Sequence, residues 1–335
     1  MAATPVAVEV WRGERVESRH RVRACVSDPD GRVLLALGDI EEPVYPRSAV
    51  KPFQALALVE SGAADVFGVG TVELALACAS HGGQPDHVAL VEAWLGRLGL
   101  DEAALACGPH APLDQPSATA MLRAGTAPSR IHNNCSGKHA GMLAAALQLG
   151  APTRGYELPQ HAVQRHCAGA IAALAGLDRL PAPGIDGCGL PNHPLPLRGL
   201  ARAAAILADP SRQAPIRQAA LTRIGAAMRA QPHMVAGTGR CCTALMALVP
   251  DVIAKTGAEG AYLAALPSRG LGIAIKAEDG ATRAAETALL ALLAHLGALG
   301  GEVPEGLQRF RTPRLRNTAG SVVGHVRPAA GWPGP

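Results

Sequence analysis

The sequence predicts an α+β fold in which strands from both ends of the chain form one sheet and the middle of the chain is mostly helical. Stretches of alternating apolar residues lie near the N-terminus, at residues 6–10, 22–26 and 33–37. Helical spacing of apolar residues dominates from about residue 48 to 246, and strand-like stretches return after residue 260. Strands at both ends with helices between them are typical of this fold class.

We expect residues 1–335 to form a single domain, with a sheet part over about 1–45 and 255–330 and a helical part over about 46–254. A chain of 335 residues that is 48% hydrophobic can bury a large core. It contains no internal repeat and no long linker that would divide it.

The elements follow from local patterns. Residues 28–31 read Asp-Pro-Asp-Gly, a turn sequence of the kind that joins antiparallel strands. In the middle of the chain, Asp86 is expected to cap a helix. Further helices are expected over residues 158–177, 215–230 and 282–299, and further strands over residues 262–266, 272–275 and 322–326.

Composition narrows the class of protein. The net charge of +4 is spread along the chain, and nine aromatic residues offer little to stack on bases, so nucleic acid is not expected as a partner. The longest apolar run, about residues 288–299, is too short to span a membrane, and the N-terminus does not resemble a secretory signal. Eight cysteines in such a chain indicate reduced thiols. We therefore expect a cytoplasmic protein that does not bind a membrane.

Lysine is rare in this sequence. Only Lys51, Lys138, Lys255 and Lys276 occur, and every other basic residue is an arginine. Arginine cannot lose its proton in a protein, whereas lysine can become a base or a metal ligand. Each lysine is therefore a candidate for chemistry that arginine cannot perform, although Lys276 lies in a strand-like stretch and needs no such role.

Residues 133–142 bring a thiol, a hydroxyl, an amine and an imidazole together. Small polar residues lead directly into an apolar run, which predicts a helix that ends at about Gln148, before Gly150. Cys135 and Lys138 then lie on one face of the helix start, where the helix dipole favours a thiolate. A capping loop with a buried cysteine is the alternative interpretation.

Two motifs suggest a serine nucleophile. Ser48 and Lys51 form Ser-x-x-Lys, in which a desolvated lysine can take the proton of the hydroxyl. Lys255 begins Lys-Thr-Gly ahead of the late strands, an order also found in serine β-lactamases and penicillin-binding proteins. Ser80 lies in a loop of small residues and could be a second hydroxyl, paired with Lys255. A capping or turn serine explains either position equally simply.

Cys188 lies between two glycines, in a tightly turned stretch at residues 185–191. With Cys135 it could supply two thiolates to a zinc ion, and His139 or a neutral Lys138 could be the third ligand. The two cysteines are too far apart in sequence to match a zinc finger, so the firmer prediction is that their side chains lie close together.

These motifs together resemble the rhizobial-type (class 3) L-asparaginases over about residues 5–280. The stretches that carry the resemblance are residues 46–52, 79–82, 133–139, 186–191 and 236–240. The resemblance implies a β-lactamase-like fold, a homodimer, and hydrolysis of L-asparagine to L-aspartate and ammonia.

The resemblance also implies roles for ten residues. Two serine–lysine tandems fall on Ser48 with Lys51 and on Ser80 with Lys255. A Zn²⁺ site falls on Cys135, Lys138 and Cys188, and residues that line the substrate site fall on Arg47, His139 and Asp186. In the mechanism that we expect, Ser48 attacks the side-chain carboxamide and Lys51 is the base.

Two rival hypotheses remain open from the residues alone. A β-lactamase or D,D-peptidase would use the same Ser-x-x-Lys and Lys-Thr-Gly motifs, but its substrates lie outside the cytoplasm. A non-catalytic zinc or thiol protein would use the cysteines and would leave Ser48, Lys51 and Lys255 unexplained. The residues do not decide between asparagine and glutamine, or between the two serines as nucleophile.

Overall fold

The computed structural model describes residues 3–334, which divide into two compact units. Of these residues, unit 1 contains 3–49, 195–209 and 244–334, and unit 2 contains 50–194 and 210–243. The sheet part and the helical part expected from the sequence correspond to units 1 and 2, except that residues 46–49, 195–209 and 244–254 belong with the sheet. The description of the whole chain as a single domain stays a prediction.

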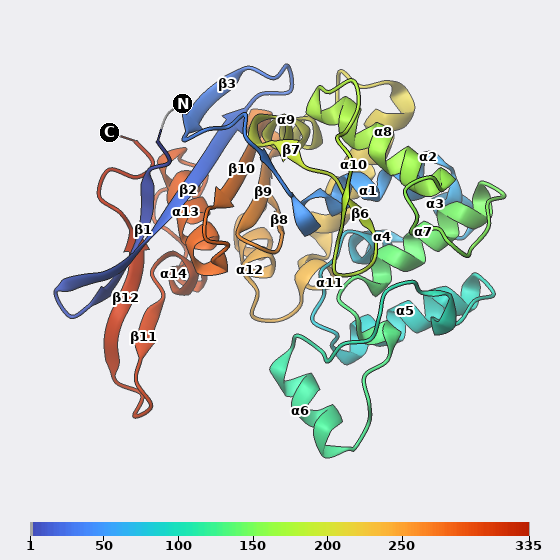
Figure 1. The fold of residues 1–335 in the computed structure, drawn as a ribbon, viewed down its shortest axis with the longest axis horizontal. Helices are drawn as coiled ribbons and strands as arrows, with labels where there is room; N and C mark the ends of the chain where they lie inside the picture. The colour runs from blue at the N-terminus through green and yellow to red at the C-terminus, as the bar shows by residue number, and fades with distance from the viewer. Residues whose placement is uncertain (1–2, 335) are drawn as a thin grey trace. The chain divides into compact units, whose positions relative to one another are not determined.

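The core of unit 1 is an antiparallel sheet that joins the two ends of the chain (Figure 1). In the described residues it has eight strands, in the order β11-β12-β1-β2-β10-β9-β8, with β3 paired to β2. The blue N-terminal strands β1 and β2 thus lie between red β12 and orange β10, which confirms the α+β prediction. The strand bounds are β1 Val6–Arg12, β2 Arg15–Ser27, β3 Val33–Leu37, β8 Ile253–Thr256, β9 Ala261–Leu266, β10 Leu271–Ala277, β11 Arg314–Arg316 and β12 Val322–Pro328.

Helices cover the central strands of this sheet. Every residue of β9 is buried, which requires cover on both faces because successive side chains point to opposite sides. Helices α9 (Leu197–Ala208) and α13 (Thr282–His295) both pack against β9 and β10. The remaining elements of unit 1 are β4 Pro43–Val44, paired with β7 Leu195–Pro196, and η4 Pro267–Arg269 and α14 Glu305–Arg311.

Gly272 allows α9 to approach β10 closely, and replacing it should show how much the packing depends on it. A Cβ atom there would lie 2.1 Å from Ala201 O and Ala205 N of the helix backbone. We expect Gly272→Ala to lower the free energy of unfolding by about 3 kcal/mol or more in urea titrations, because backbone must move. The same substitution at exposed Gly169, inside α8 with open space around it, should raise stability by about 0.5–1 kcal/mol. Equal midpoints for Gly272→Ala and the wild type would contradict the close approach.

Unit 2 is built almost entirely from helices. Its α-helices are α1 Lys51–Gln54, α2 Leu56–Glu60, α3 Ala63–Val66, α4 Thr71–Ala77, α5 Pro85–Arg97, α6 Gln115–Arg123, α7 Ser136–Gln148, α8 Ala162–Ala175, α10 Pro215–Ala230 and α11 Pro232–Ala236. Its shorter elements are η2 Glu102–Ala104, η3 Arg130–His132, β5 Gly184–Ile185 and β6 Pro191–Asn192. Two helices, η1 Arg47–Val50 and α12 Cys241–Leu248, lie where the chain passes between the units.

Helix α7 is the central helix of unit 2. Residues 136–146 are all buried, so the helix is covered on every side. A Cβ at Gly137 would lie 2.7 Å from the carbonyl oxygen of Leu76, so this glycine is required for the packing of α7 on α4. Helix packing therefore explains why Gly137, in the chemically dense stretch at 133–142, is a glycine.

Several boundaries differ from the sequence predictions. Gln84 is the N-cap of α5 and Asp86 lies in its first turn, so the prediction that Asp86 caps the helix was wrong. Pro85 explains the earlier start, because proline suits the first helical position. Helix α8 begins at Ala162 rather than near 158, and α13 ends at His295 rather than near 299. Among the described residues, no helix has the length and apolar character needed to cross a membrane.

Candidate active site

The amine of Lys51 is the centre of a buried polar cluster in unit 2. Lys51 is the first residue of α1, and only 1% of its surface is exposed. Its Nζ donates hydrogen bonds to Ala79 O, to Ser80 Oγ at 2.9 Å and to Cys135 Sγ at 3.1 Å. Burial lowers the pKa of Lys51 below the ordinary lysine value. A buried amine that gives up its proton readily beside a hydroxyl can act as a general base.

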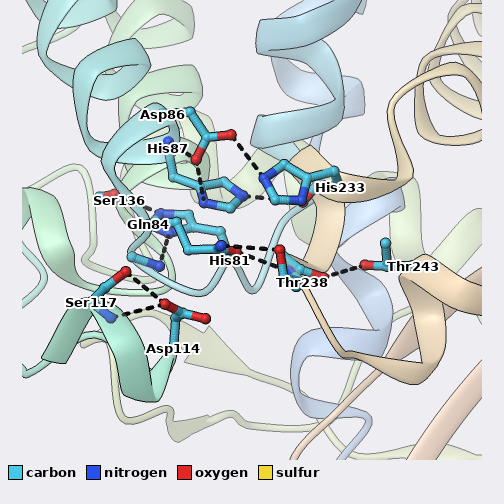
Figure 2. Close-up of polar contacts among 12 residues, drawn as sticks. His81, Gln84, Asp86, His87, Asp114, Ser117, Ser136, His233, Thr238 and Thr243 are labelled. Carbon is cyan, nitrogen blue, oxygen red and sulfur yellow. Dashed lines mark hydrogen bonds and ion pairs between the residues drawn. The ribbon is translucent and has the colours of Figure 1, made fainter. Parts of the chain in front are cut away.

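The loop after α4 holds Ser80 in place. The backbone N–H of Ser80 donates to Val235 O at 3.0 Å. The next side chain, His81, accepts a hydrogen bond at Nδ1 from the Gly83 N–H, so its Nε2 carries the proton and donates to Ser136 Oγ at 2.9 Å (Figure 2). Both anchors lie in unit 2, and they present the Ser80 hydroxyl to the lysine amine.

Two buried thiols and a second lysine lie in the same unit. The exposed fractions of Cys135, Lys138 and Cys188 are 5%, 4% and 6%, and Lys138 Nζ donates to Cys188 Sγ at 3.1 Å. A hydrogen bond from the Cys135 thiol, together with the charge of Lys138, lowers the pKa of Cys188 to about 4. That hydrogen bond and burial raise the pKa of Cys135 to about 11. This hydrogen bond places the two sulfur atoms close together, as expected from the sequence, and makes Cys188 the more readily ionised thiol.

A tight turn places Cys188. The turn joins β5 to β6, and the Asp186 N–H donates to Leu190 O at 2.9 Å. Gly189 adopts a φ of 86°, a left-handed conformation that glycine alone reaches without strain. The glycines around Cys188 therefore form the tightly turned loop that the sequence predicted.

His139 is neutral and presents one unpaired N–H. The hydroxyl of Tyr156 accepts the Ala106 N–H at 2.8 Å, so its own proton is donated to His139 Nδ1 at 2.5 Å. Burial, together with the charge of Lys138, lowers the pKa of His139 to about 3. Its Nε2–H is buried and has no hydrogen-bond partner among the described residues. Such a donor is available to a bound ligand.

In unit 1, Ser48 lies in a strained turn next to the strand that carries Lys255. Arg47 has a φ of 53°, in the left-handed region that costs energy for a residue with a side chain. A Cβ at Gly257 would lie 2.6 Å from Pro46 O, so the end of β8 packs directly against this turn. Lys255 is fully buried, and the alternation along the strand places it on the same face as Gly257.

The predicted residues thus fall in both units. Unit 1 contains Arg47, Ser48 and Lys255, and unit 2 contains Lys51, Ser80, Cys135, Lys138, His139, Asp186 and Cys188. Each predicted tandem, Ser48 with Lys51 and Ser80 with Lys255, joins residues of different units and stays a prediction. The contact between Lys51 and Ser80 was not predicted.

Two features were not predicted from the sequence: the tyrosine that orients His139, and a cluster of one aspartate and two histidines. Tyr156, which orients His139, is one of only three tyrosines in the chain, so its rarity was a usable signal. Asp86, His87 and His233 each offer a ligand atom within 4.8 Å of the others, and no sequence spacing indicates this group. Side chains of the types that can bind a metal ion therefore gather at two places in unit 2, here and around the thiol pair.

Comparison with known proteins identifies the family of this chain and, at low sequence identity, solved structures that resemble it. The sequence profile described as L-asparaginase II matches residues 8–328. No curated protein sequence matches.

Three solved structures illustrate the structural likenesses. The native form of Mglu is 16% identical over 87% of this chain, with a TM-score of 0.46. A Bacillus subtilis glutaminase in covalent complex with 5-oxo-L-norleucine is 16% identical over 85% of this chain and 89% of its own, with a TM-score of 0.38. A β-lactamase from Mycobacterium bovis is 16% identical over 83% of this chain and 94% of its own, with a TM-score of 0.41. The chain spans 63% of the length of Mglu.

Proposed function

The chain belongs to the L-asparaginase II family, and we propose that it hydrolyses L-asparagine to L-aspartate and ammonia through an acyl-enzyme. The observation that carries this proposal beyond the family is the Lys51 amine, buried, with a lowered pKa, 2.9 Å from the Ser80 hydroxyl. The structural alternative was a capping serine with a solvated lysine. That alternative does not explain why the serine and the lysine are buried and in contact. The contact suits proton transfer during acyl transfer.

In the proposed reaction, the Ser48 hydroxyl oxygen attacks the side-chain amide carbon and its proton passes to Lys51. Backbone N–H groups near Ser48 hold the oxyanion of the tetrahedral intermediate. The C–N bond then breaks, and the nitrogen takes a proton and leaves as ammonia. Ser80, in contact with Lys51 and supported by Lys255, relays that proton. Water, deprotonated by the same groups, cleaves the ester to release L-aspartate and restore the serine.

The substrate is a zwitterion, so its recognition needs both signs of charge. We assign the α-carboxylate to Arg47, whose guanidinium can bind a carboxylate in a bidentate manner. We assign the α-ammonium to Asp186. The neutral His139, with its buried unpaired Nε2–H, can donate to a substrate oxygen.

The proposed function is tested by ammonia release from L-asparagine by the purified full chain, with zinc supplied and L-glutamine as the comparison amide. We expect turnover of asparagine. Because one methylene in a pocket is worth about 1–3 kcal/mol, glutamine should be hydrolysed about 10–200-fold less efficiently if the pocket fits asparagine. If neither amide releases ammonia, the proposal fails, and acylation by a penicillin becomes the next measurement.

We further propose that Cys135, Lys138 and Cys188 hold a Zn²⁺ ion. Two sulfur atoms and an amine nitrogen, all buried within one unit, form a donor set that suits zinc. Bound zinc would supply positive charge that orients the substrate. Before zinc can bind, the thiol groups and the Lys138 ammonium group must release their protons. Burial lowers the pKa of Lys138, but the charges of Cys135 and Cys188 raise it more, so its net pKa lies above the ordinary value.

Zinc content at this site should fall as the pH is lowered from 9 to 6. Lys138 and Cys135 both have raised pKa values, so zinc must displace their protons, and the competition strengthens at lower pH. The measurement is bound zinc per chain after equilibration with a zinc buffer, in the wild type and in Cys188→Ser. The pH-dependent zinc that belongs to this site should be lost in Cys188→Ser and kept in Cys25→Ala, which changes a buried cysteine of unit 1. Constant zinc content over this range would contradict the ligand set.

The family resemblance also suggests a homodimer. Light scattering of the purified chain tests this part of the proposal, and a monomer at micromolar concentration would contradict it.

A further inference from the structure

Three imidazole rings form a stack at the start of α5. The His87 ring lies between those of His81 and His233, with centroid separations of 5.0 and 4.9 Å (Figure 2). His87 and the neighbouring Asp86 belong to the first turn of α5, and His233 belongs to α11. All four residues lie in unit 2, so their relative positions are those of one compact unit.

The hydrogen bonds determine which nitrogen of His87 carries the proton. His87 Nε2 lies 3.0 Å from the carbonyl oxygen of His233, and a carbonyl can only accept. Nε2 therefore carries the proton, and Nδ1 of the neutral ring carries a lone pair. His87 is completely buried, and its Nδ1 has no hydrogen-bond partner among residues 3–334.

This lone pair faces a carboxylate. The nearest charged atom is Asp86 Oδ1 at 3.4 Å, and Asp86 Oδ2 lies 2.8 Å from His233 Nε2. Two acceptors therefore face each other, and no hydrogen bond joins them. The stacked neighbours on both sides leave the ring little room to turn. A cation between the two acceptors satisfies both.

We propose that Asp86, His87 and His233 bind one divalent transition-metal ion, separate from the zinc proposed at the thiol pair. Ligands of a tetrahedral zinc ion lie ~3.3–3.5 Å apart, which matches the Asp86–His87 separation of 3.4 Å. Metal-binding histidines characteristically donate their other N–H to a backbone carbonyl, as His87 does. The side chains of Asp86 and His233 are 48% and 36% exposed, so the ion has a path of entry and room for a water ligand.

The ion would join α5 to α11, and α11 also positions Ser80. The carbonyl oxygen of Val235, two residues after His233, accepts the Ser80 N–H at 3.0 Å. A second link between the same segments already exists, because Gln84 exchanges hydrogen bonds with Thr238 at 3.0 and 2.8 Å (Figure 2). The metal is therefore structural, and its loss should lower thermal stability.

The test is zinc and cobalt binding by the metal-free full chain, in His233→Gln and Asp86→Asn beside the wild type. His295→Gln, at an exposed histidine of unit 1, is the matched control. We expect each site variant to lose one equivalent of zinc or to bind it at least about 100-fold more weakly. We also expect each to lose the rise in thermal midpoint that zinc produces at this site, while His295→Gln keeps both.

Cobalt separates this site from the thiol site. Thiolate-to-cobalt charge-transfer absorption should persist in His233→Gln and disappear in Cys188→Ser, so failure of either proposed site is recognised independently of the other. If His233→Gln and Asp86→Asn bind as much zinc as the wild type with the same affinity, the group is an ordinary aspartate–histidine ion pair and the proposal is wrong.

Discussion

Replacing Ser48 with alanine is expected to lower kcat for L-asparagine hydrolysis by at least about 10⁴-fold, because the proposed acyl-enzyme cannot form without its oxygen. Ser48 follows a residue in strained backbone, and the end of β8 packs against the same turn. Strain of this kind is typical of sites that aim a reacting group. The measurement is steady-state ammonia release, with circular dichroism to establish that the variant is folded.

Covalent trapping distinguishes the two serines. A diazoketone analogue of asparagine alkylates a nucleophile and releases N₂, so it should add its mass less that of N₂ to the wild type and to Ser80→Ala, but not to Ser48→Ala. Ser321→Ala, at an exposed serine of unit 1, is the matched control and should behave as the wild type. An adduct that persists in Ser48→Ala and is absent in Ser80→Ala would reverse the two roles, and the 2.9 Å contact of Ser80 with Lys51 makes that outcome chemically sound.

Replacing Lys51 with arginine should be nearly as damaging, with an expected loss of about 10³-fold or more in kcat/KM. Arginine keeps the positive charge but cannot become neutral, so it cannot accept the serine proton. Lys51→Met, which removes the charge and is easier to bury, should be equally inactive and should remain folded. Near-wild-type activity in Lys51→Arg would show that the lysine serves only as a fixed charge.

The pH profile of the wild type gives an independent check on Lys51. Burial lowers its pKa below the ordinary value of 10.5, although the neighbouring thiol sulfurs oppose the shift. The neutral base therefore accumulates as the pH rises through this lowered pKa. Accordingly, kcat/KM should increase by about tenfold per pH unit below that pKa and level off above it. A profile that keeps rising up to the ordinary lysine value of 10.5, with no plateau below it, would contradict a base with a lowered pKa.

Much of the fold was predictable because its signals are local. The alternating residues at 6–10 and 33–37 became β1 and β3, and the helical spacing at 215–230 became α10 with the same bounds. Helix boundaries were less predictable where neighbouring residues could each mark the start of the helix. Asp86 looked like a cap, but Pro85 begins the helix and leaves Asp86 inside the first turn. The pairing of the terminal strands followed from fold-class reasoning, and the sheet order bears it out.

The candidate site was predictable in its residues and much less so in its contacts. Scarcity of lysine singled out Lys51, Lys138 and Lys255, because that signal depends on residue type alone. The two tandems and the zinc ligands were suggested by short motifs and assigned by resemblance to a family, and those assignments stay predictions. Within unit 2, Lys51 is in contact with Ser80 and Cys135, which lie 29 and 84 residues away in the sequence.

The sequence by itself determined which side chains can do chemistry and where strands and helices form, since both depend on neighbouring residues. Only the tertiary structure decided which of those side chains meet. Ser80 reaches Lys51 because the loop after α4 is anchored to α11, and His87 meets His233 because α5 and α11 both pack against α4. Such contacts arise from the burial of whole helices, and no periodicity in the chain encodes them.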